Sequence, residues 1–226
     1  MKIKSLAAAL AALMVSQLVP AETITRSDSR GNISQINIGV GRTNRVDDAG
    51  QPDERLQATE REVRPGQFSR LTIRVPADVV YTQGSPNLVK LRGPANALRR
   101  IRVEEAGGRL TIDTRDNFSS SGRITIEVTG SAVKELELFG AIDARIRRIN
   151  SARFSIAMSG AVSLQGSGRA GQCVLSVSGS GDADLEGLKC GTLELTAQGA
   201  ADLHLYADKR IGGSAAGAVD VTVSGN

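Results

Sequence analysis

Aromatic residues are scarce in this 226-residue chain: they make up 3% of it, and tryptophan is absent. Such a composition suits a narrow interior filled by Val, Ile, Leu and Ala better than an aromatic-lined sugar cleft or a base-stacking surface. The chain has one histidine and two cysteines, and it shows no serine or cysteine nucleophile motif, phosphate-binding loop or nucleic-acid module. We therefore expect no catalytic triad, zinc site or nucleic-acid partner, and we interpret His204 as a surface residue.

Long hydrophobic runs are missing except at the N-terminus. Lys2 and Lys4 come before an apolar run of 15 residues, Ser5 to Val19, and Val19-Pro20-Ala21 offers small residues for cleavage after Ala21. The run is shorter than the roughly 20 residues that a membrane-spanning helix needs. No cysteine lies directly beside the cleavage point, as a lipoprotein signal would require. The sequence thus predicts an exported protein, periplasmic or extracellular, that is not a lipoprotein and has no transmembrane segment after cleavage.

One pattern recurs between residues 134 and 223. Five glycines recur at spacings of 20, 19, 20 and 18 residues. The even offsets from −6 to +6 around each glycine are nearly all apolar or small, while odd offsets are mostly polar. Alternation with period two is typical of a strand with one buried row, and helical repeats are longer, at roughly 33 residues or more. We predict an all-β fold, a right-handed parallel β-helix (a single-stranded solenoid) with rungs of about 19 residues. Hairpin turns of an antiparallel sandwich are the alternative. The glycines are Gly140, Gly160, Gly179, Gly199 and Gly217.

Three parts are expected along the chain: a signal peptide over 1–21, an N-terminal strand and polar linker over 22–66, and a β-helix domain over 67–226. Within the second part, Ile33 to Val40 alternates like a strand, and residues 41–66 are polar without a sustained period. From Phe68 on, short apolar segments are separated by Gly and Pro turn signals at irregular spacing, and we predict strands there, such as Leu88 to Leu91, Leu98 to Val103 and Leu110 to Asp113. We interpret them as atypical first rungs, with regular rungs from about residue 134.

Carboxylates recur three residues after the glycines, as Asp143, Asp182, Asp202 and Asp220. Because oxygen ligands at turns suit Ca²⁺, Asp182, Asp202 and Asp220 form a candidate calcium site, the one cofactor considered. Asx turns that cap each corner are the alternative. Asp143 is followed at alternate positions by Arg145 and Arg147. These two arginines and the four aspartates are therefore candidates for ligand binding.

The two cysteines, Cys173 and Cys190, are predicted to form a disulfide, because neighbouring rungs would bring them within range and an exported compartment permits the bond. The last rung, Ile211 to Val223, keeps apolar residues at inward offsets. A stack that stops there leaves an open edge, which a homodimer through this rung would cover.

The sequence also resembles a known bacterial family. The segments that carry the resemblance are FSRLTIRVPADVVYTQGSPNLVKLRGPANALRRIRVEEAGGRLTID, ITIEV, LELFGAIDARI, SGSGDADLEG and GAADLHL. Over roughly Phe68 to Val223 the chain is similar to the putative autotransporter adhesin, head GIN domain family. The resemblance implies an exported protein with an all-β stacked fold, and it carries over no catalytic residue.

Taken together, these features predict an exported, non-catalytic binding or adhesion-type module of the bacterial cell envelope. The expected partner is an envelope glycan or another surface component. One alternative is a polysaccharide-active β-helix enzyme, which would need carboxylates and a basic residue in a groove, as Asp143, Arg145 and Arg147 could provide. The other is a structural, self-assembling envelope protein.

Overall fold

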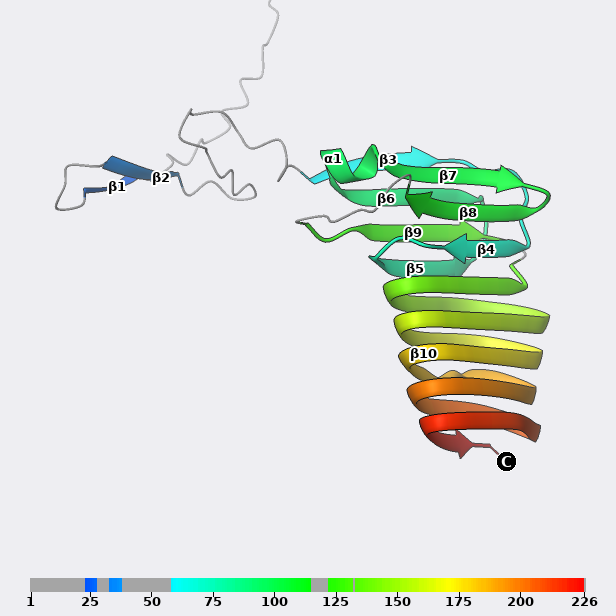
Figure 1. Cartoon of the computed structure of the whole chain (residues 1–226). Coiled ribbons are helices and arrows are strands. Elements are labelled where there is room, and N and C mark those ends of the chain that lie inside the picture. Colours follow the sequence, from blue (N-terminus) through cyan, green and yellow to red (C-terminus); the bar gives the residue numbers. More distant parts are fainter. Residues whose placement is uncertain (1–22, 28–32, 38–57, 115–121, 132, 226) are drawn as a thin grey trace, which may run out of the picture. The chain divides into compact units, whose positions relative to one another are not determined.

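The computed structural model describes residues 23–27, 33–37, 58–114, 122–131 and 133–225 (Figure 1). Contacts divide the chain into two units, Met1–Thr43 and Asn44–Asn226. In the first unit, β1 (Thr23–Ser27) pairs antiparallel with β2 (Ile33–Asn37). Strand β2 falls within the predicted strand from Ile33 to Val40, and the expected signal peptide lies outside the described residues.

The second unit is built on an eight-stranded sheet with the order β3-β6-β9-β5-β10-β4-β8-β7. Within the described residues, one short helix, α1 (Ala95–Leu98), interrupts the strands, and it ends at Leu98, where the strand predicted over Leu98 to Val103 was expected to start. The strands are β3 (Ala58–Val63), β4 (Arg70–Ile73), β5 (Ala77–Gln83), β6 (Leu88–Pro94), β7 (Ile101–Ala106), β8 (Arg109–Thr114), β9 (Thr125–Gly130) and β10 (Glu135–Ser224).

The predicted right-handed parallel β-helix is wrong for this chain. The sheet mixes parallel pairs with three antiparallel ones, β3 with β6, β6 with β9 and β7 with β8. The reason is visible at Gly107 and Gly108, which join β7 to β8 with φ values of 58° and 72°. A two-residue loop with positive φ at both positions can join only antiparallel strands, whereas a parallel pair needs a long crossover. The regular pattern after residue 134 therefore does not extend back to Phe68.

Strand β10 is 90 residues long and winds in successive turns (Figure 1). Its first residues pair in parallel with β4, with Leu136 opposite Leu71, and the next segment pairs in parallel with β5, with Ala144 opposite Val79. A methyl group added to Gly179 would lie 2.6 Å from the carbonyl oxygen of Gly160. Residues one glycine spacing apart thus stack on neighbouring turns of β10.

Alternating side chains of these strands meet in one hydrophobic core that extends from Phe68 to Leu205. Tyr81 on β5 is fully buried in it, and its hydroxyl donates a hydrogen bond to the carbonyl oxygen of Gly130 at 2.8 Å. Burial disfavours the ionised phenol and raises the pKa of Tyr81 far above its usual value of 10. The one buried tyrosine therefore has to stay neutral while the protein is folded.

We expect Tyr81→Phe to lower the free energy of unfolding at pH 7 by about 1 to 2 kcal/mol, because the Gly130 carbonyl loses its partner. The native protein should also lose stability as the pH rises above 10, since only the unfolded chain then ionises this phenol. Urea unfolding followed by circular dichroism at pH 7 and pH 10.5 measures both effects. If Tyr81→Phe lost as much stability between pH 7 and pH 10.5 as the unsubstituted protein, this role for the buried hydroxyl would be contradicted.

The edge strand β3 lies inside the stretch that the sequence predicted to be a linker. It is held to β6 by paired charges: Arg92 contacts Glu60 at 2.7 Å, and Lys90 contacts Glu62 at 2.8 Å. The hydrogen bond from Arg92 lowers the pKa of the Glu60 carboxyl. Charged side chains on an edge strand also discourage pairing with other chains.

Candidate functional site

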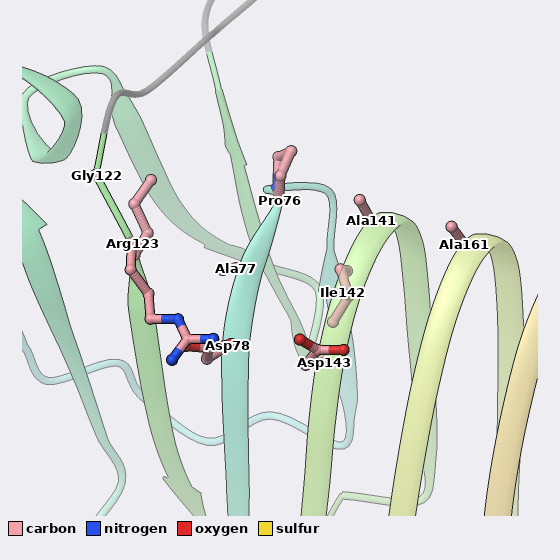
Figure 2. Close-up of a pocket in the computed structure, with 10 residues that line it drawn as sticks. Pro76, Ala77, Asp78, Gly122, Arg123, Ala141, Ile142, Asp143 and Ala161 are labelled. Atoms are coloured by element: carbon pink, nitrogen blue, oxygen red, sulfur yellow. The ribbon is translucent and has the colours of Figure 1, made fainter.

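A hollow of about 370 Å³ opens where β5 and β10 lie side by side, and we call it the β5–β10 pocket (Figure 2). Its polar side chains are Asp78 from β5, Arg123 from the segment before β9, and Asp143 from β10. Asp78 and Asp143 occupy facing positions of the parallel pair between β5 and β10. The register of these two strands therefore sets the spacing of the two carboxylates, at about 4.8 Å between backbones.

Arg123 reaches across to Asp78, with its Nε 2.8 Å from Oδ2 (Figure 2). The Arg123 side chain is 79% exposed and that of Asp78 25% exposed, so solvent weakens this ion pair. Asp143 lies on the exposed face of β10. The pocket thus presents two carboxylates and one guanidinium group to solvent, with small apolar residues around them.

Such a pocket is suited to binding hydroxyl groups, which donate to carboxylates and accept from guanidinium groups. Glycoside hydrolysis needs one carboxyl group held as a proton donor by apolar surroundings. Asp78 is engaged in an ion pair and Asp143 is exposed, so neither has such surroundings. The geometry supports binding better than catalysis.

Of the residues proposed as ligand-binding around this position, only Asp143 lines the pocket. Arg145 and Arg147 follow it on the same exposed face of β10. Arg145 donates from Nε to Oε1 of Gln165 on the next turn at 3.2 Å, and Arg147 lies opposite Thr82 of β5. The structure therefore places the three residues in a row without bringing them together. Sequence reasoning missed Asp78 and Arg123, because only the register between β5 and β10 brings them beside Asp143.

The proposed calcium ligands Asp182, Asp202 and Asp220 lie exposed on successive turns of β10. Asp202 contacts His204 on the same turn, with Oδ1 3.4 Å from Nε2. Within the parts of the chain that the structure describes, no group of three Asp, Glu, His or Cys side chains is placed to hold a metal ion. Calcium binding by this column stays a prediction from the sequence.

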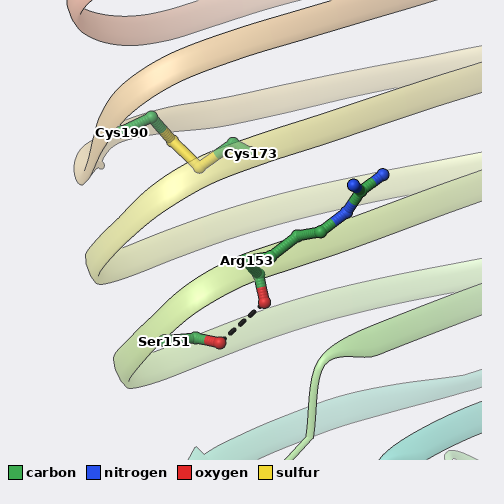
Figure 3. The surroundings of a disulfide bond; sticks show 4 residues. All are labelled: Ser151, Arg153, Cys173 and Cys190. Atoms are coloured by element: carbon green, nitrogen blue, oxygen red, sulfur yellow. Dashed lines mark hydrogen bonds between the residues drawn. A yellow bond between two sulfur atoms is a disulfide. The ribbon is translucent and has the colours of Figure 1, made fainter.

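Cys173 and Cys190 form a disulfide in the structure, with 5.8 Å between their Cα atoms (Figure 3). Both cysteines are buried, and they connect two neighbouring turns of β10. The bond therefore fixes the positions of these two turns relative to each other at the two cysteines.

The described residues contain no helix long and apolar enough to cross a membrane. This finding does not extend to the first 22 residues, where the sequence predicts the signal peptide.

Among solved structures, the chain is similar to a putative adhesin from Bacteroides fragilis, with a TM-score of 0.55, 15% identity, and coverage of 75% of this chain and 95% of that one. This likeness concerns the fold alone. Weaker matches are a putative lipid binding protein from Parabacteroides distasonis (TM-score 0.44, 18% identity, 74% and 96% covered) and a putative cell adhesion protein from Clostridium sporogenes (TM-score 0.42, 11% identity, 76% and 100% covered). No curated protein matches the sequence.

The family resemblance expected from the sequence is confirmed. A model of the family described as putative auto-transporter adhesin, head GIN domain matches residues 67–226, which is most of the chain. The protein therefore belongs to the putative auto-transporter adhesin, head GIN domain family.

Proposed function

We propose that this protein is an exported, non-catalytic adhesion-type module that binds a glycan of the cell envelope or of a neighbouring surface. The observation that carries the proposal is membership of an adhesin-like family over residues 67–226. The β5–β10 pocket supports it, because the exposed carboxylate of Asp143 on β10 and the exposed guanidinium group of Arg123 can pair with sugar hydroxyls.

An array of bacterial and host glycans, probed with the purified chain, tests this function. We expect selective retention of a small set of glycans, and the same glycans should be recovered with unchanged chain length after prolonged incubation. Asp143→Asn removes the exposed carboxylate of the pocket and should weaken binding of a ligand held there by roughly tenfold. The absence of binding to every glycan would contradict the adhesion proposal, and shortened glycans would favour the polysaccharide-active alternative.

Export is tested separately, by the mass of the protein recovered from the periplasm or medium of an expressing bacterium. Cleavage after Ala21 gives a chain that starts at Glu22. An intact N-terminus in the cytoplasmic fraction would contradict the predicted signal peptide.

We also propose that two copies associate through the last turn of β10. Ile211 and Val223 are the large hydrophobic side chains that stand exposed in the described part of the chain, at 42% and 40%, and both lie on this turn. Pairing with the same turn of a second molecule would cover them and close the assembly with two-fold symmetry.

Light scattering at micromolar concentration should therefore give the mass of a dimer, and Val223→Lys should give that of a monomer. The matched control is Ala106→Lys, which places the same charge at an exposed position of β7, away from the last turn. A monomer for the unsubstituted chain would exclude this interface.

A further inference from the structure

A second hollow, of about 380 Å³, lies on β10 beside the disulfide, and we call it the disulfide pocket. It draws residues from successive turns of the strand. Its polar side chains are Asn150, Ser151, Arg169, Lys189, Tyr206 and Asp208. Neither the basic residues nor the tyrosine belong to the candidate sites derived from the sequence.

The stacking of the turns places the two cations next to each other. A methyl group on Gly171 would lie 2.7 Å from the Ala152 carbonyl oxygen, and one on Gly191 would lie 2.6 Å from that of Gly171. The residues two positions earlier, Asn150, Arg169 and Lys189, therefore occupy equivalent places on three neighbouring turns, about 4.8 Å apart. Like charges at this spacing repel each other, and a bound anion would relieve the repulsion.

The two cations differ in what holds them. The Lys189 ammonium lies over the ring of Tyr206, with Nζ 3.7 Å from the ring centroid, so a cation–π contact keeps it at the pocket. Arg169 is exposed, on the turn next to that of Lys189. Asp208 lines the same pocket but has an interaction of its own. The pocket therefore offers one exposed guanidinium fork beside one ammonium group that an aromatic ring holds.

From this geometry we propose that the disulfide pocket binds an acidic sugar residue of an anionic glycan. Arg169 and Lys189 hold its acid group, because a guanidinium fork pairs with two oxygens of a carboxylate or phosphate while an ammonium group adds a point charge. The inference rests on the glycan-binding function proposed above and names the class of glycan.

The remaining polar groups favour a sugar over a bare anion. The pocket volume is in the range that ligands larger than an inorganic ion fill. The Ser151 hydroxyl donates to the carbonyl oxygen of Arg153 at 2.6 Å, which leaves its oxygen able to accept a further hydrogen bond (Figure 3). The Asn150 amide and the Tyr206 hydroxyl can each donate and accept. These three groups match sugar hydroxyls, whereas an inorganic anion would leave them unused.

The disulfide holds the two cations of the pocket at a fixed spacing. Cys190 follows Lys189 directly, and its bond to Cys173 ties the turn that carries Lys189 to the turn that carries Arg169. Reduction would let the two turns move apart, so the spacing of the cations would no longer be fixed.

Calorimetric titration of the full chain with a tetrasaccharide of alternating glucuronic acid and N-acetylglucosamine tests the inference. We expect binding that weakens with salt, and at least tenfold weaker binding of the same tetrasaccharide after its carboxyl groups are reduced to alcohols. Arg169→Ala should weaken binding of the acidic form by tenfold or more, and Arg169→Lys by less, since it keeps the charge and loses the fork. Arg64→Ala removes an exposed cation elsewhere and should leave binding unchanged.

Competition experiments distinguish an acid group carried by a sugar from a free inorganic anion. Glucose 1-phosphate displacing the tetrasaccharide at a lower concentration than inorganic phosphate supports recognition of an acidic sugar, and equal displacement by both contradicts it. Two results would show that the pocket assignment is wrong while the adhesion function stands. In the first, Arg169→Ala binds glycans as tightly as the unsubstituted chain does. In the second, the carboxyl-reduced tetrasaccharide binds as tightly as the acidic one. If no glycan binds at all, the proposed function fails as well.

Discussion

Replacing Gly179 by alanine will lower the free energy of unfolding by about 3 to 5 kcal/mol, in urea titrations followed by circular dichroism. Two costs add at this position. Gly179 has φ of 120°, a conformation that side chains with a Cβ rarely adopt, and the new methyl group would lie 2.6 Å from the carbonyl oxygen of Gly160 on the preceding turn. The neighbouring atom belongs to the backbone, so it cannot move aside without disturbing the stacking of the turns.

Two other glycines of the same strand separate these costs. Gly140 has φ of 108° but no neighbour within 4 Å of an added methyl group, so Gly140→Ala should lose only roughly 1 to 3 kcal/mol from backbone strain. At Gly212 the methyl group would meet open space and the backbone is not in the positive-φ region, so alanine should leave stability equal or raise it by up to about 1 kcal/mol. Equal losses at Gly179 and Gly140 would show that close contact between turns is unimportant.

Removing the disulfide should have an effect of similar size. The bond closes a segment with a sequence separation of 17, and loops of this length stabilise a fold by about 3 kcal/mol through restriction of the unfolded chain. We expect the double variant Cys173→Ala/Cys190→Ala to lose about this much in urea unfolding. Alanine is the appropriate replacement because both positions are buried, and serine would add unpaired hydroxyl groups.

Reductant provides the matched control for the disulfide. The unsubstituted protein in reductant should unfold at the same urea concentration as the double variant, and the variant itself should not respond to reductant. Titration of thiols in the denatured, unreduced protein should find none. Two free thiols, together with unfolding that reductant does not change, would mean that the bond is not formed.

The strands could be predicted where apolar residues alternate, and their pairing could not. Segments such as Leu88 to Leu91 and Leu110 to Asp113 lie within β6 and β8, because alternation reports which side chains face a core. Alternation is the same for parallel and antiparallel pairs, so it did not show that β7 and β8 form a hairpin. Strand β3 was missed because its sequence, ATEREV, is charged as an edge strand's often is.

The candidate site was predictable in part for the same reason. Asp143 stood out through its fixed distance from a glycine, whereas Asp78 and Arg123 belong to segments without a regular spacing. Arg169 and Lys189 could have been found by aligning the turns of β10, since they are one glycine spacing apart. They were overlooked because they lie far from the recurring glycines within each turn, and only the contact of Lys189 with Tyr206 singles them out.

The winding of β10 has a mechanical consequence for a protein of adhesin type. Its turns stack on one another, and the amide of Ser155 donates to the carbonyl of Lys134, the residue just before β10, at 2.8 Å. Tension on the C-terminal end therefore loads the turns one after another. Each turn released adds the length of one glycine spacing, roughly 60 to 70 Å of extended chain. Peeling by this route reaches Cys190, where a covalent bond to the previous turn adds to the hydrogen bonds. The disulfide then acts as a stop that lets the outer turns yield under load while the turns nearer β4 and β5 keep their shape.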